Sequence, residues 1–452
     1  MVSGAPGAHV GVVGGGMLGL TLALRLRERG HRVTLLEGAP ALGGLAASME
    51  LGGHACDRFY HVVLAADTAL QALLAEIGAA DRLRWRTTRT GFYVDGRLLS
   101  LSSALDFVRF PPLGPVDKLR LGLTVLRAAR LRDWRALEAE PVADWLRRHS
   151  GRRTFERIWL PLLRSKLGEN YRVTSASFIW ATIARLYGAR SGGAKREQFG
   201  WLDGGYVAVL ERFAAHLAER GVEVRCAARA AEVRQHDEGG ATVRLATGET
   251  LAFDAVALTL PTGRIADLAP QLGGAERARL RGVTYQGIVC ATVLLRRPLA
   301  DYYVTNITDG WVPFTAVVEM TALADPAQFG GRALVYLPRY LAQDDPMWQE
   351  DDAAIERRFV DALLRMYPAM RRDDVLAFRV SRAREVLALT TLHYSERWLP
   401  PVATSLRDVF VVTSAQIAAG TLNVNETVRV ADAGAAEVAA RLAAAPALGA
   451  AA

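Results

Sequence analysis

The sequence predicts an α/β protein of two domains, and two observations support that prediction. Its 452 residues exceed the length of a usual single domain. Its first 37 residues contain, in order, an apolar strand pattern, a glycine-rich turn, a helical pattern, a second strand pattern and an acidic residue. Strands that alternate with helices are typical of a parallel sheet covered by helices.

The strand–helix–strand unit occupies residues 10–36. Val10–Val13 is a short apolar run of the kind that forms a buried strand. Met17–Arg29 carries apolar residues at helical spacing and stops at Gly30, a residue that commonly ends a helix. Arg32–Leu36 then predicts the second strand. Together these elements predict a βαβ unit.

The turn between the first strand and the helix carries the pattern G-x-G-x-x-G. In a dinucleotide-binding unit Gly14 makes the tight turn, Gly16 lets the backbone approach a pyrophosphate, and Gly19 lets helix and strand pack closely. Met17 and Leu18 open the helix, whose N-terminal N–H groups favour a phosphate. We therefore predict a dinucleotide site at this turn.

The second strand ends at Glu37, where a carboxylate accepts hydrogen bonds from the adenosine ribose. Gly38 and the two residues after it provide no arginine for a 2′-phosphate, so NADP is not expected. The pair Gly43 and Gly44 follows, with Leu45 next. This segment, EGAPALGGLA, resembles the FAD family that includes amine oxidases, protoporphyrinogen oxidase, phytoene-type desaturases and UDP-galactopyranose mutase. The resemblance implies FAD as cofactor, with this pair beside its pyrophosphate and ribityl chain.

The resemblance covers nearly the whole chain and implies a Rossmann-type FAD-binding domain (three-layer ββα) with an inserted α+β substrate domain. It places the backbone of Val233 against the adenine. The expected boundaries are 1–66, 198–280 and 396–445 for the FAD domain, 67–197 and 281–395 for the substrate domain, and 446–452 for a flexible tail.

Within these domains the patterns predict a hairpin that turns at Asp95-Gly96, a second hairpin at 241–251, and one helix at Asp352–Met366. Near the carboxyl end, Thr413-Ser414 stands where the family carries Gly-Asp. Ser414 offers the pyrophosphate–ribityl region a hydroxyl without a charge. Asn423 then starts a helix as an N-x-x-E capping box. The resemblance points this helix at the flavin pyrimidine edge, with Asn425, Glu426 and Thr427 as the contacting residues.

The segment GGHACDRFYHVVLAAD follows the stretch that passes the FAD. Its Tyr60, His61 and Asp67 resemble the pattern with which the mutase branch places a histidine beside the flavin. A histidine moves protons near neutrality, so Tyr60 and His61 are the catalytic candidates. The alternative is that His61 only shapes the pocket. Arg58 is a candidate partner for an anionic substrate or the pyrophosphate, or a solvated side chain.

Four further residues are candidates for the substrate pocket. Lys166 lies among apolar residues outside the lysine motif of the amine oxidases, so we carry no role over and expect an ion pair with Glu169. Trp201 is a candidate pocket wall or a core residue. His393 and Tyr394 line the cavity or belong to a loop between the domains.

Composition limits the partners. The net charge of +8 comes without a long run of like charges, so no nucleic acid is expected. The three cysteines are far apart, and no metal cluster appears, so neither a disulfide framework nor a metal site is expected. There is no signal peptide and no run long enough for a transmembrane segment, which favours a cytoplasmic monomer or homodimer. The segment FVRFPPLGPVDKLRLGLTVLRAARLRDW suits a core-packed helix or, as the alternative, peripheral membrane contact.

We expect an FAD-dependent oxidoreductase in which flavin N5 takes hydride from a carbon of a small-molecule substrate, and oxygen or another electron acceptor reoxidises the flavin. The arginine- and alanine-rich composition suggests a bacterial enzyme of secondary or glycan metabolism. One alternative is a nucleotide-sugar mutase that works with reduced FAD. Another is a non-catalytic binding subunit, supported only by Ser414 in place of the acid.

Overall fold

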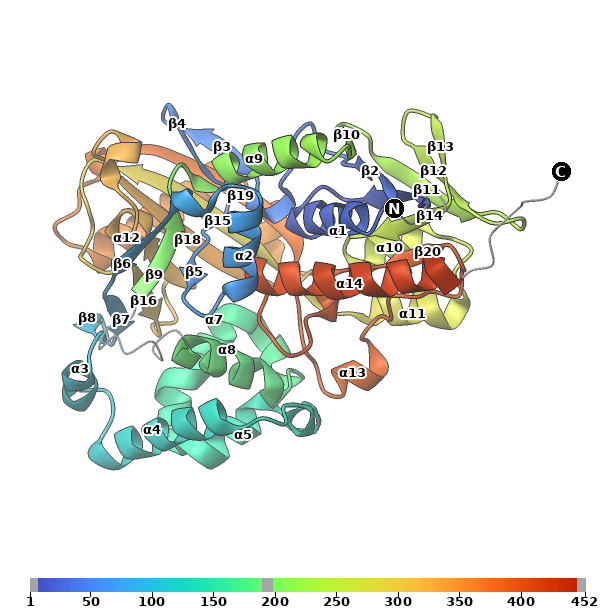
Figure 1. Ribbon diagram of the computed structural model, residues 1–452. Coiled ribbons are helices and arrows are strands. Elements are labelled where there is room, and N and C mark those ends of the chain that lie inside the picture. Colours follow the sequence, from blue (N-terminus) through green and yellow to red (C-terminus); the bar gives the residue numbers. More distant parts are fainter. Residues whose placement is uncertain (1–6, 189–197, 445–452) are drawn as a thin grey trace.

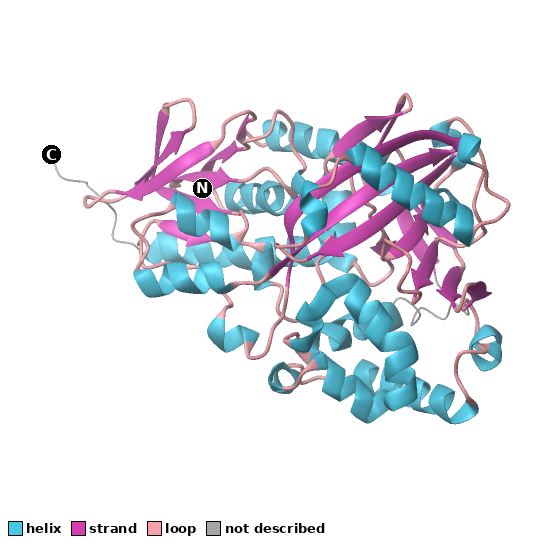
Figure 2. Cartoon of the chain, turned by 180° about the vertical axis from the view of Figure 1, so that it is seen from behind, coloured by secondary structure: helices cyan, strands magenta, loops and turns pink. Residues whose placement is uncertain are grey.

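The computed structural model describes residues 7–188 and 198–444, so the tail expected at 446–452 lies outside the described residues. Figure 1 shows three regions: a parallel sheet with its helices on the right, a larger mixed sheet on the left, and a lobe of helices below. Figure 2 shows the same lobe from behind, under the large sheet.

The parallel sheet has five strands in the order β10-β2-β1-β14-β20. These strands are β1 (His9–Val13), β2 (Arg32–Leu36), β10 (Glu223–Arg225), β14 (Ala255–Leu258) and β20 (Val409–Val411). The strand order reverses beside β1, which has β2 on one side and β14 on the other. In open parallel sheets this reversal leaves a crevice at the carboxyl ends of the strands, where ligands bind.

Both faces of this sheet are covered. One face packs against the helices α1 (Met17–Glu28), α9 (Gly205–Glu219) and α14 (Val424–Ala444). The other face packs against the antiparallel sheet of β11 (Ala230–Gln235), β12 (Ala241–Leu245) and β13 (Thr250–Phe253), and against α10 (Thr262–Leu268) and α11 (Gly274–Gly282). Two β layers and one α layer confirm the predicted three-layer ββα arrangement.

The second sheet has seven strands in the order β19-β15-β18-β17-β16-β7-β8. They are β7 (Thr90–Val94), β8 (Arg97–Ser100), β15 (Tyr285–Leu295), β16 (Val304–Ile307), β17 (Ala316–Glu319), β18 (Ala333–Leu341) and β19 (Val375–Ala388). One face packs on the helix α12 (Asp352–Met366), whose bounds are those predicted. The other face packs on Leu45, Tyr60 and Trp201. The sheet therefore presses its second face against the chain that leaves the glycine turn.

The remaining elements connect these sheets. The predicted hairpin turns at Asp95 and Gly96, which both have positive φ (52° and 71°) as this turn requires. The helices of this part are α2 (Thr68–Glu76), α3 (Ala104–Arg109), α4 (Pro115–Arg130), α5 (Val142–Ser150), α6 (Arg152–Thr154), α7 (Leu160–Leu167), α8 (Ala176–Gly188) and α13 (Tyr394–Arg397). The short strands are β3 (Ser48–Leu51), β4 (His54–Asp57), β5 (Val63–Leu64), β6 (Leu83–Thr87) and β9 (Gln198–Leu202).

Gly19, the last glycine of the G-x-G-x-x-G pattern, packs against the turn between β1 and α1. A Cβ on Gly19 would lie 1.8 Å from the carbonyl oxygen of Gly14, so no side chain fits there. We expect Gly19→Ala to lower the melting temperature by about 2–6 °C, because forcing a methyl group into packed backbone costs about 1–3 kcal/mol.

The matched control is Gly122→Ala in α4, where a Cβ meets nothing within 4 Å. Alanine is the better helix former by about 0.5–1 kcal/mol, so this variant should melt at or above the wild-type temperature. Thermal unfolding followed by circular dichroism measures both. Equal melting temperatures for the two variants would contradict the packing role of Gly19.

Candidate active site

The helix α1 begins at a glycine that brings no capping side chain. Gly16 is its N-cap, and its first turn contains no acidic residue. Met17 and Leu18, the first residues of the helix, are buried. Free N–H groups at a helix start, together with the helix dipole, favour an anion there. The residues present therefore fit the pyrophosphate of a dinucleotide.

The second glycine pair lies directly against the first cluster. The N–H of Gly43 donates to the carbonyl of Gly15 at 2.9 Å, and Gly43 pairs with Gly16 as an isolated parallel bridge. A Cβ on Gly44 would lie 3.2 Å from the Cα of Gly16. Gly43 and Gly44 also have positive φ (129° and 56°), which favours glycine. The two clusters thus form one cradle of bare backbone.

The carboxylate of Glu37 is fixed at the edge of this cradle. It accepts hydrogen bonds from the N–H of Gly15 at 2.6 Å and from the N–H of Ala39 at 2.7 Å. A carboxylate oxygen has two lone-pair sites, so each oxygen can still accept a ribose hydroxyl. The predicted ribose partner is therefore held ready by the same turn that would bind the pyrophosphate.

The backbone that runs beside Glu37 belongs to residues that sequence reasoning missed. The N–H of Ala228 donates to the carbonyl of Glu37, and that of Ala227 donates to Ala39. A Cβ on Gly38 would lie 3.3 Å from Arg229. The predicted adenine neighbour, Val233, has its side chain fully buried in the core between the two β layers. Its backbone contact with adenine stays a prediction. The loop of Ala227, Ala228 and Arg229 lies nearer to Glu37, and its alanine-rich sequence contains no pattern that would have indicated this position.

The residues that replace the family Gly-Asp point in different directions. The hydroxyl of Thr413 donates to the carbonyl of Leu260 at 2.8 Å and is buried. Ser414 instead lines a small hollow together with Thr390. This hollow, of about 10 Å³, is too small for a ligand, so the contact of Ser414 with the pyrophosphate–ribityl region stays a prediction.

The start of α14 is capped as predicted, but its polar side chains are occupied. The N–H of Glu426 donates to Asn423 Oδ1 at 3.0 Å, and the hydroxyl of Thr427 donates to the Asn423 carbonyl. Asn425 is buried; its Oδ1 accepts from the first N–H groups of α2, and its Nδ2 donates to Glu426. The Asn425 amide holds α2 against α14, so the flavin contacts of Asn425, Glu426 and Thr427 stay a prediction for the backbone of this helix start and not for that amide. The free backbone N–H groups remain for a ligand.

A buried polar cluster lies on the second sheet. The hydroxyls of Tyr60 and Tyr340 are 3.0 Å apart, and Lys166 Nζ lies 3.8 Å from the centre of the Tyr340 ring. Burial raises the pKa of the Tyr60 hydroxyl and raises that of Tyr340 to about 12, while burial lowers the pKa of the Lys166 ammonium. These shifts share one cause, since a low-polarity environment disfavours each charged form.

The expected ion pair between Lys166 and Glu169 is wrong. Glu169 is exposed on the other side of the helix end and pairs with Arg164 at 3.3 Å and Arg172 at 2.8 Å. Among the described residues Lys166 has no carboxylate partner, and its favourable contact is with the ring of Tyr340. Three residues separate the pair, a helical spacing, but α7 ends at Leu167 and Gly168 follows with positive φ (56°), so Glu169 no longer lies on the helix face of Lys166.

Gln286 is another polar residue near Tyr340, and the sequence analysis did not identify it as a candidate. It is fully buried on β15, two residues before Ile288, which pairs with Tyr340. Its Oε1 accepts from Asn170 Nδ2 at 3.1 Å, while its Nε2 has no partner among the described residues. A buried unpaired donor costs free energy unless a ligand or water satisfies it. The available signal was one glutamine in the otherwise apolar strand YQGIVCATVLL.

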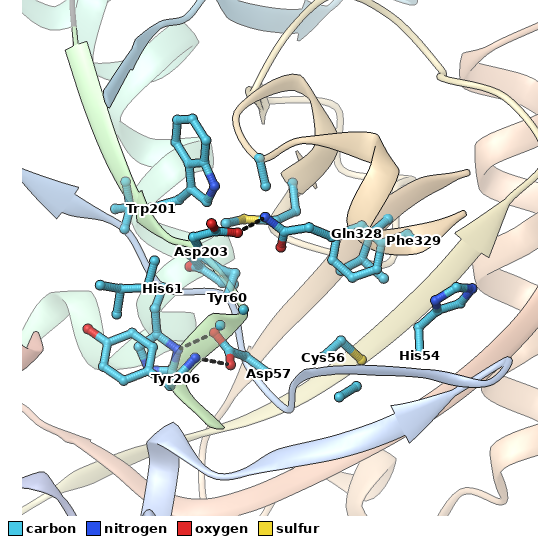
Figure 3. A pocket seen from close by; sticks show the side chains of 18 of the residues that line it. His54, Cys56, Asp57, Tyr60, His61, Trp201, Asp203, Tyr206, Gln328 and Phe329 are labelled. Carbon is cyan, nitrogen blue, oxygen red and sulfur yellow. Dashed lines mark hydrogen bonds and ion pairs between the residues drawn. The ribbon is translucent and has the colours of Figure 1, made fainter. Parts of the chain in front are cut away.

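Tyr60 also lines a cavity of about 390 Å³, shown in Figure 3. The cavity lies between β4, β9, the start of α9 and β18, and His61 and Trp201 are part of its wall. Other residues of the wall are His54, Cys56, Asp57, Asp203, Tyr206, Gln328, Phe329 and Tyr336. Of the predicted pocket residues, Trp201, Tyr60 and His61 are brought together here.

Three polar atoms of the cavity wall are buried without a hydrogen-bond partner: His61 Nδ1, Trp201 Nε1 and Tyr206 Oη. His61 Nδ1 lies 3.8 Å from the carboxylate of Asp57, beyond hydrogen-bond distance. Asp57 instead accepts from the N–H of Tyr206 at 2.9 Å and so holds the start of α9 (Figure 3). These atoms are enclosed by the wall itself, so they are unsatisfied polar groups beside the cavity and not groups open to a ligand within it.

The remaining predicted pocket residues lie elsewhere. Arg58 is not part of the described cavity wall, and its guanidinium lies 5.9 Å from the ring centre of Phe59. Tyr394 is buried, and its hydroxyl donates to the carbonyl of Ala415 at 2.7 Å. His393 has positive φ (56°) at the start of α13 and lies 3.8 Å from Glu396. His393 and Tyr394 therefore belong to a structural turn, the second of the two sequence interpretations.

Comparison with known proteins agrees with this geometry. Residues 18–416 match the family of flavin containing amine oxidoreductases. Coproporphyrinogen III oxidase of Mycobacterium tuberculosis is 30% identical over 293 residues, which cover 60% of this chain and 63% of that protein. Zeta-carotene desaturase of Arabidopsis thaliana is 28% identical over 185 residues, 35% of this chain and 32% of that protein. The solved structure of cyclohexylamine oxidase from Brevibacterium oxydans shares the fold, with a TM-score of 0.70 at 17% identity over 97% of this chain and 100% of that one.

The position of Glu37 gives a test of cofactor binding. We expect Glu37→Ala to weaken FAD binding about tenfold or more, because it removes the ribose acceptor and leaves the N–H of Gly15 unpaired. The ratio of flavin to protein absorbance after purification, and titration of the apoprotein with FAD, measure this. Glu50→Ala, the same change at an exposed position on β3, is the control. Equal FAD affinity in both variants would contradict the ribose role.

The lowered pKa of Lys166 predicts a pH-dependent stability. Below that pKa the folded protein carries a buried ammonium. Its cost begins to fall as the pH rises above that pKa and is gone above 10.5, the ordinary lysine pKa, because between the two values only the unfolded chain keeps its proton. Lys166→Met should therefore raise the melting temperature by about 2 °C near neutral pH, and by less as the pH approaches that of the free amine. Lys118→Met on the surface is the control. A gain that does not shrink with rising pH would contradict this account.

Proposed function

The chain belongs to the family of flavin containing amine oxidoreductases, and from this membership we propose that it is an FAD-dependent oxidoreductase. Its proposed reaction removes a hydride from a carbon of a small-molecule substrate, and oxygen or another acceptor then takes the electrons. The expected setting, bacterial secondary or glycan metabolism, stays a prediction from composition. The chain spans 63% of the coproporphyrinogen oxidase, so that protein's activity is not transferred whole.

The observation that carries this proposal is the contact between Gly43 and the Gly15–Gly16 backbone. One glycine cluster suits any dinucleotide, whereas two clusters in contact give an extended cradle for a longer cofactor. FAD, when bound, supplies the two-electron acceptor. Everything else in the reaction is left to side chains that hold a substrate and keep water away.

Tyr60 and Lys166 are the side chains that the proposal assigns to this task. The Tyr60 hydroxyl is held by Tyr340 at 3.0 Å, which fixes its ring between the cavity and the second sheet. Lys166, whose pKa burial lowers, offers an amine that gives up its proton more easily than a free lysine. Its Nζ lies over the ring of Tyr340, whose hydroxyl meets that of Tyr60, so these groups can pass on a proton released by a substrate. These groups therefore support orientation first and proton transfer second.

The substrate class that the site supports best is an uncharged, largely apolar molecule. Tyr60, Tyr303, Tyr336 and Tyr340 all lie in or against one cluster that also contains Phe199. Aromatic side chains provide large apolar contact area with a few polar tips, and Lys166, the described cation beside Tyr60 and Tyr340, is one whose charge is disfavoured by burial. A polyene, the substrate in the name of the desaturase relative, has this character, whereas a coproporphyrinogen carries carboxylates that this cluster does not match.

The two alternatives from the sequence receive less support. A nucleotide-sugar mutase needs cationic side chains for a diphosphate, and the described wall of the cavity contains no arginine or lysine. A non-catalytic subunit rested on Ser414, yet the backbone cradle supplies its N–H groups irrespective of that position. Neither alternative accounts for Lys166, which has no carboxylate partner among the described residues and contacts the Tyr340 ring.

Anaerobic mixing tests the proposal directly. The flavin-loaded protein is mixed with a porphyrinogen, a polyene precursor and a primary amine, and the loss of oxidised flavin absorbance is followed. We expect bleaching by an apolar donor and none by the amine. Bleaching by the amine alone would overturn the substrate class, and turnover only after dithionite reduction would favour the mutase.

Tyr60→Phe separates a positioning role from simple packing. It keeps the ring but removes the hydrogen bond to Tyr340, and we expect bleaching to slow about tenfold, the equivalent of roughly 1.4 kcal/mol. Tyr303→Phe makes the same change in the same cluster without altering that bond. Equal bleaching rates in the two variants would remove Tyr60 from the proposed mechanism.

A further inference from the structure

Large apolar side chains are exposed together on two neighbouring helices. The described residues include eight exposed large hydrophobic side chains, and five of them lie on α3 and α4. Their exposed fractions are high: Leu105 54%, Val108 66%, Val116 70%, Leu119 65% and Leu123 56%. We call these five residues the α3–α4 surface. Isolated exposed apolar residues are ordinary, but a cluster of this kind marks an interaction site.

The orientation of α4 accounts for the cluster. Val116, Leu119 and Leu123 are spaced by three and four residues, so they lie on one face of the helix. The inner side of the helix packs Leu121, Val125 and Ala128 against the lobe, and Thr124 is buried there as well. The core-packed helix preferred from the sequence is present on this inner side. A second apolar face of the helix points away from the protein.

Positive charge surrounds the apolar residues. Arg127 continues the outer face of α4 and is exposed, whereas the guanidinium of Arg120 turns toward the lobe and donates to the carbonyl of Arg148 at 3.3 Å. Arg109 ends α3. The two acidic residues of these helices are engaged at helix starts, since Asp106 accepts from the N–H groups of Ser102 and Ser103, and Asp117 from that of Gly114. The surface thus combines an apolar centre with a cationic margin.

The position and length of the helices limit what can cover them. α3 and α4 form the outer edge of the helical lobe, on the side away from the parallel sheet (Figures 1 and 2). α4 has 16 residues, about 24 Å of helix at about 1.5 Å per residue. Within residues 7–188 and 198–444, no helix is long and apolar enough to cross a bilayer. A helix of this kind suits the interface of a membrane, not its interior.

We propose that the α3–α4 surface docks the protein on a bilayer that contains anionic lipid. Val116, Leu119 and Leu123 enter the boundary between headgroups and acyl chains, and the arginines contact the lipid phosphates. The charge complementarity selects this partner over an uncharged protein face, and the net charge of +8 acts in the same direction. The inference is independent of the proposed reaction.

Flotation of the full-length protein with vesicles tests it. We expect the protein to float with vesicles of equal parts phosphatidylcholine and phosphatidylglycerol, to float less with phosphatidylcholine alone, and to be released by salt. The double variant Leu119→Gln/Leu123→Gln should lose flotation on the anionic vesicles. Arg127→Gln should weaken binding about fivefold, the effect expected for one surface cation at the membrane.

Val173→Gln, an equally conservative change at an exposed position (47%) outside the surface, is the control and should float as the wild type does. All substituted side chains are exposed, so melting temperatures should be unchanged, and flotation of the wild type tests the proposal even where a variant fails to fold. Absence of wild-type flotation, or equal loss in Val173→Gln, would overturn it. So would a dimer in solution that Leu119→Gln/Leu123→Gln dissociates, because the partner would then be a second copy.

Discussion

The hydrogen bond from the N–H of Gly43 to the carbonyl of Gly15 joins the glycine turn after β1 to the loop that follows β2. It fixes the chain that leaves β2 against the start of α1, and the neighbouring Gly16–Gly43 bridge extends the contact. No side chain separates the two backbones, because positive φ and close approach both favour glycine. The course of the chain toward β3, β4 and Tyr60 depends on this contact, and so does the placement of everything that faces the second sheet.

The connection between the cofactor cradle and the second sheet is made by aromatic hydroxyls. The hydroxyl of Tyr336 donates to the carbonyl of Asp57 at 2.9 Å, and Tyr60 meets Tyr340. Tyr336 and Tyr340 both lie on β18, so one strand of the large sheet fixes the position of the end of β4 and of the segment that follows it. Asp57 in turn accepts from the first turn of α9, which packs on α1. A chain of short polar contacts thus links the cavity wall to the parallel sheet, and buried contacts of this kind favour one arrangement over its alternatives.

Local sequence patterns gave the elements of the fold and the cradle, because both are encoded by residues close together in the chain. The βαβ unit, the Asp95-Gly96 turn and the Asp352–Met366 helix follow from periodicity and turn chemistry. The Asn423 cap was visible for the same reason. Local patterns did not give the contacts that a distant element supplies: Lys166 contacts Tyr340 rather than Glu169, and the Asn425 amide holds α2.

The sequence by itself determined the dinucleotide cradle, the acidic ribose partner and the family, since glycine spacing and one carboxylate need no tertiary context to be recognised. Only the tertiary structure decided that the two glycine clusters touch, that Gln286 keeps an unpaired amide, and that a second apolar face of α4 points outward. The reason is physical: conformational preference is a property of a few bonded residues, whereas burial, pairing and exposure are set by which surfaces the folded chain brings together.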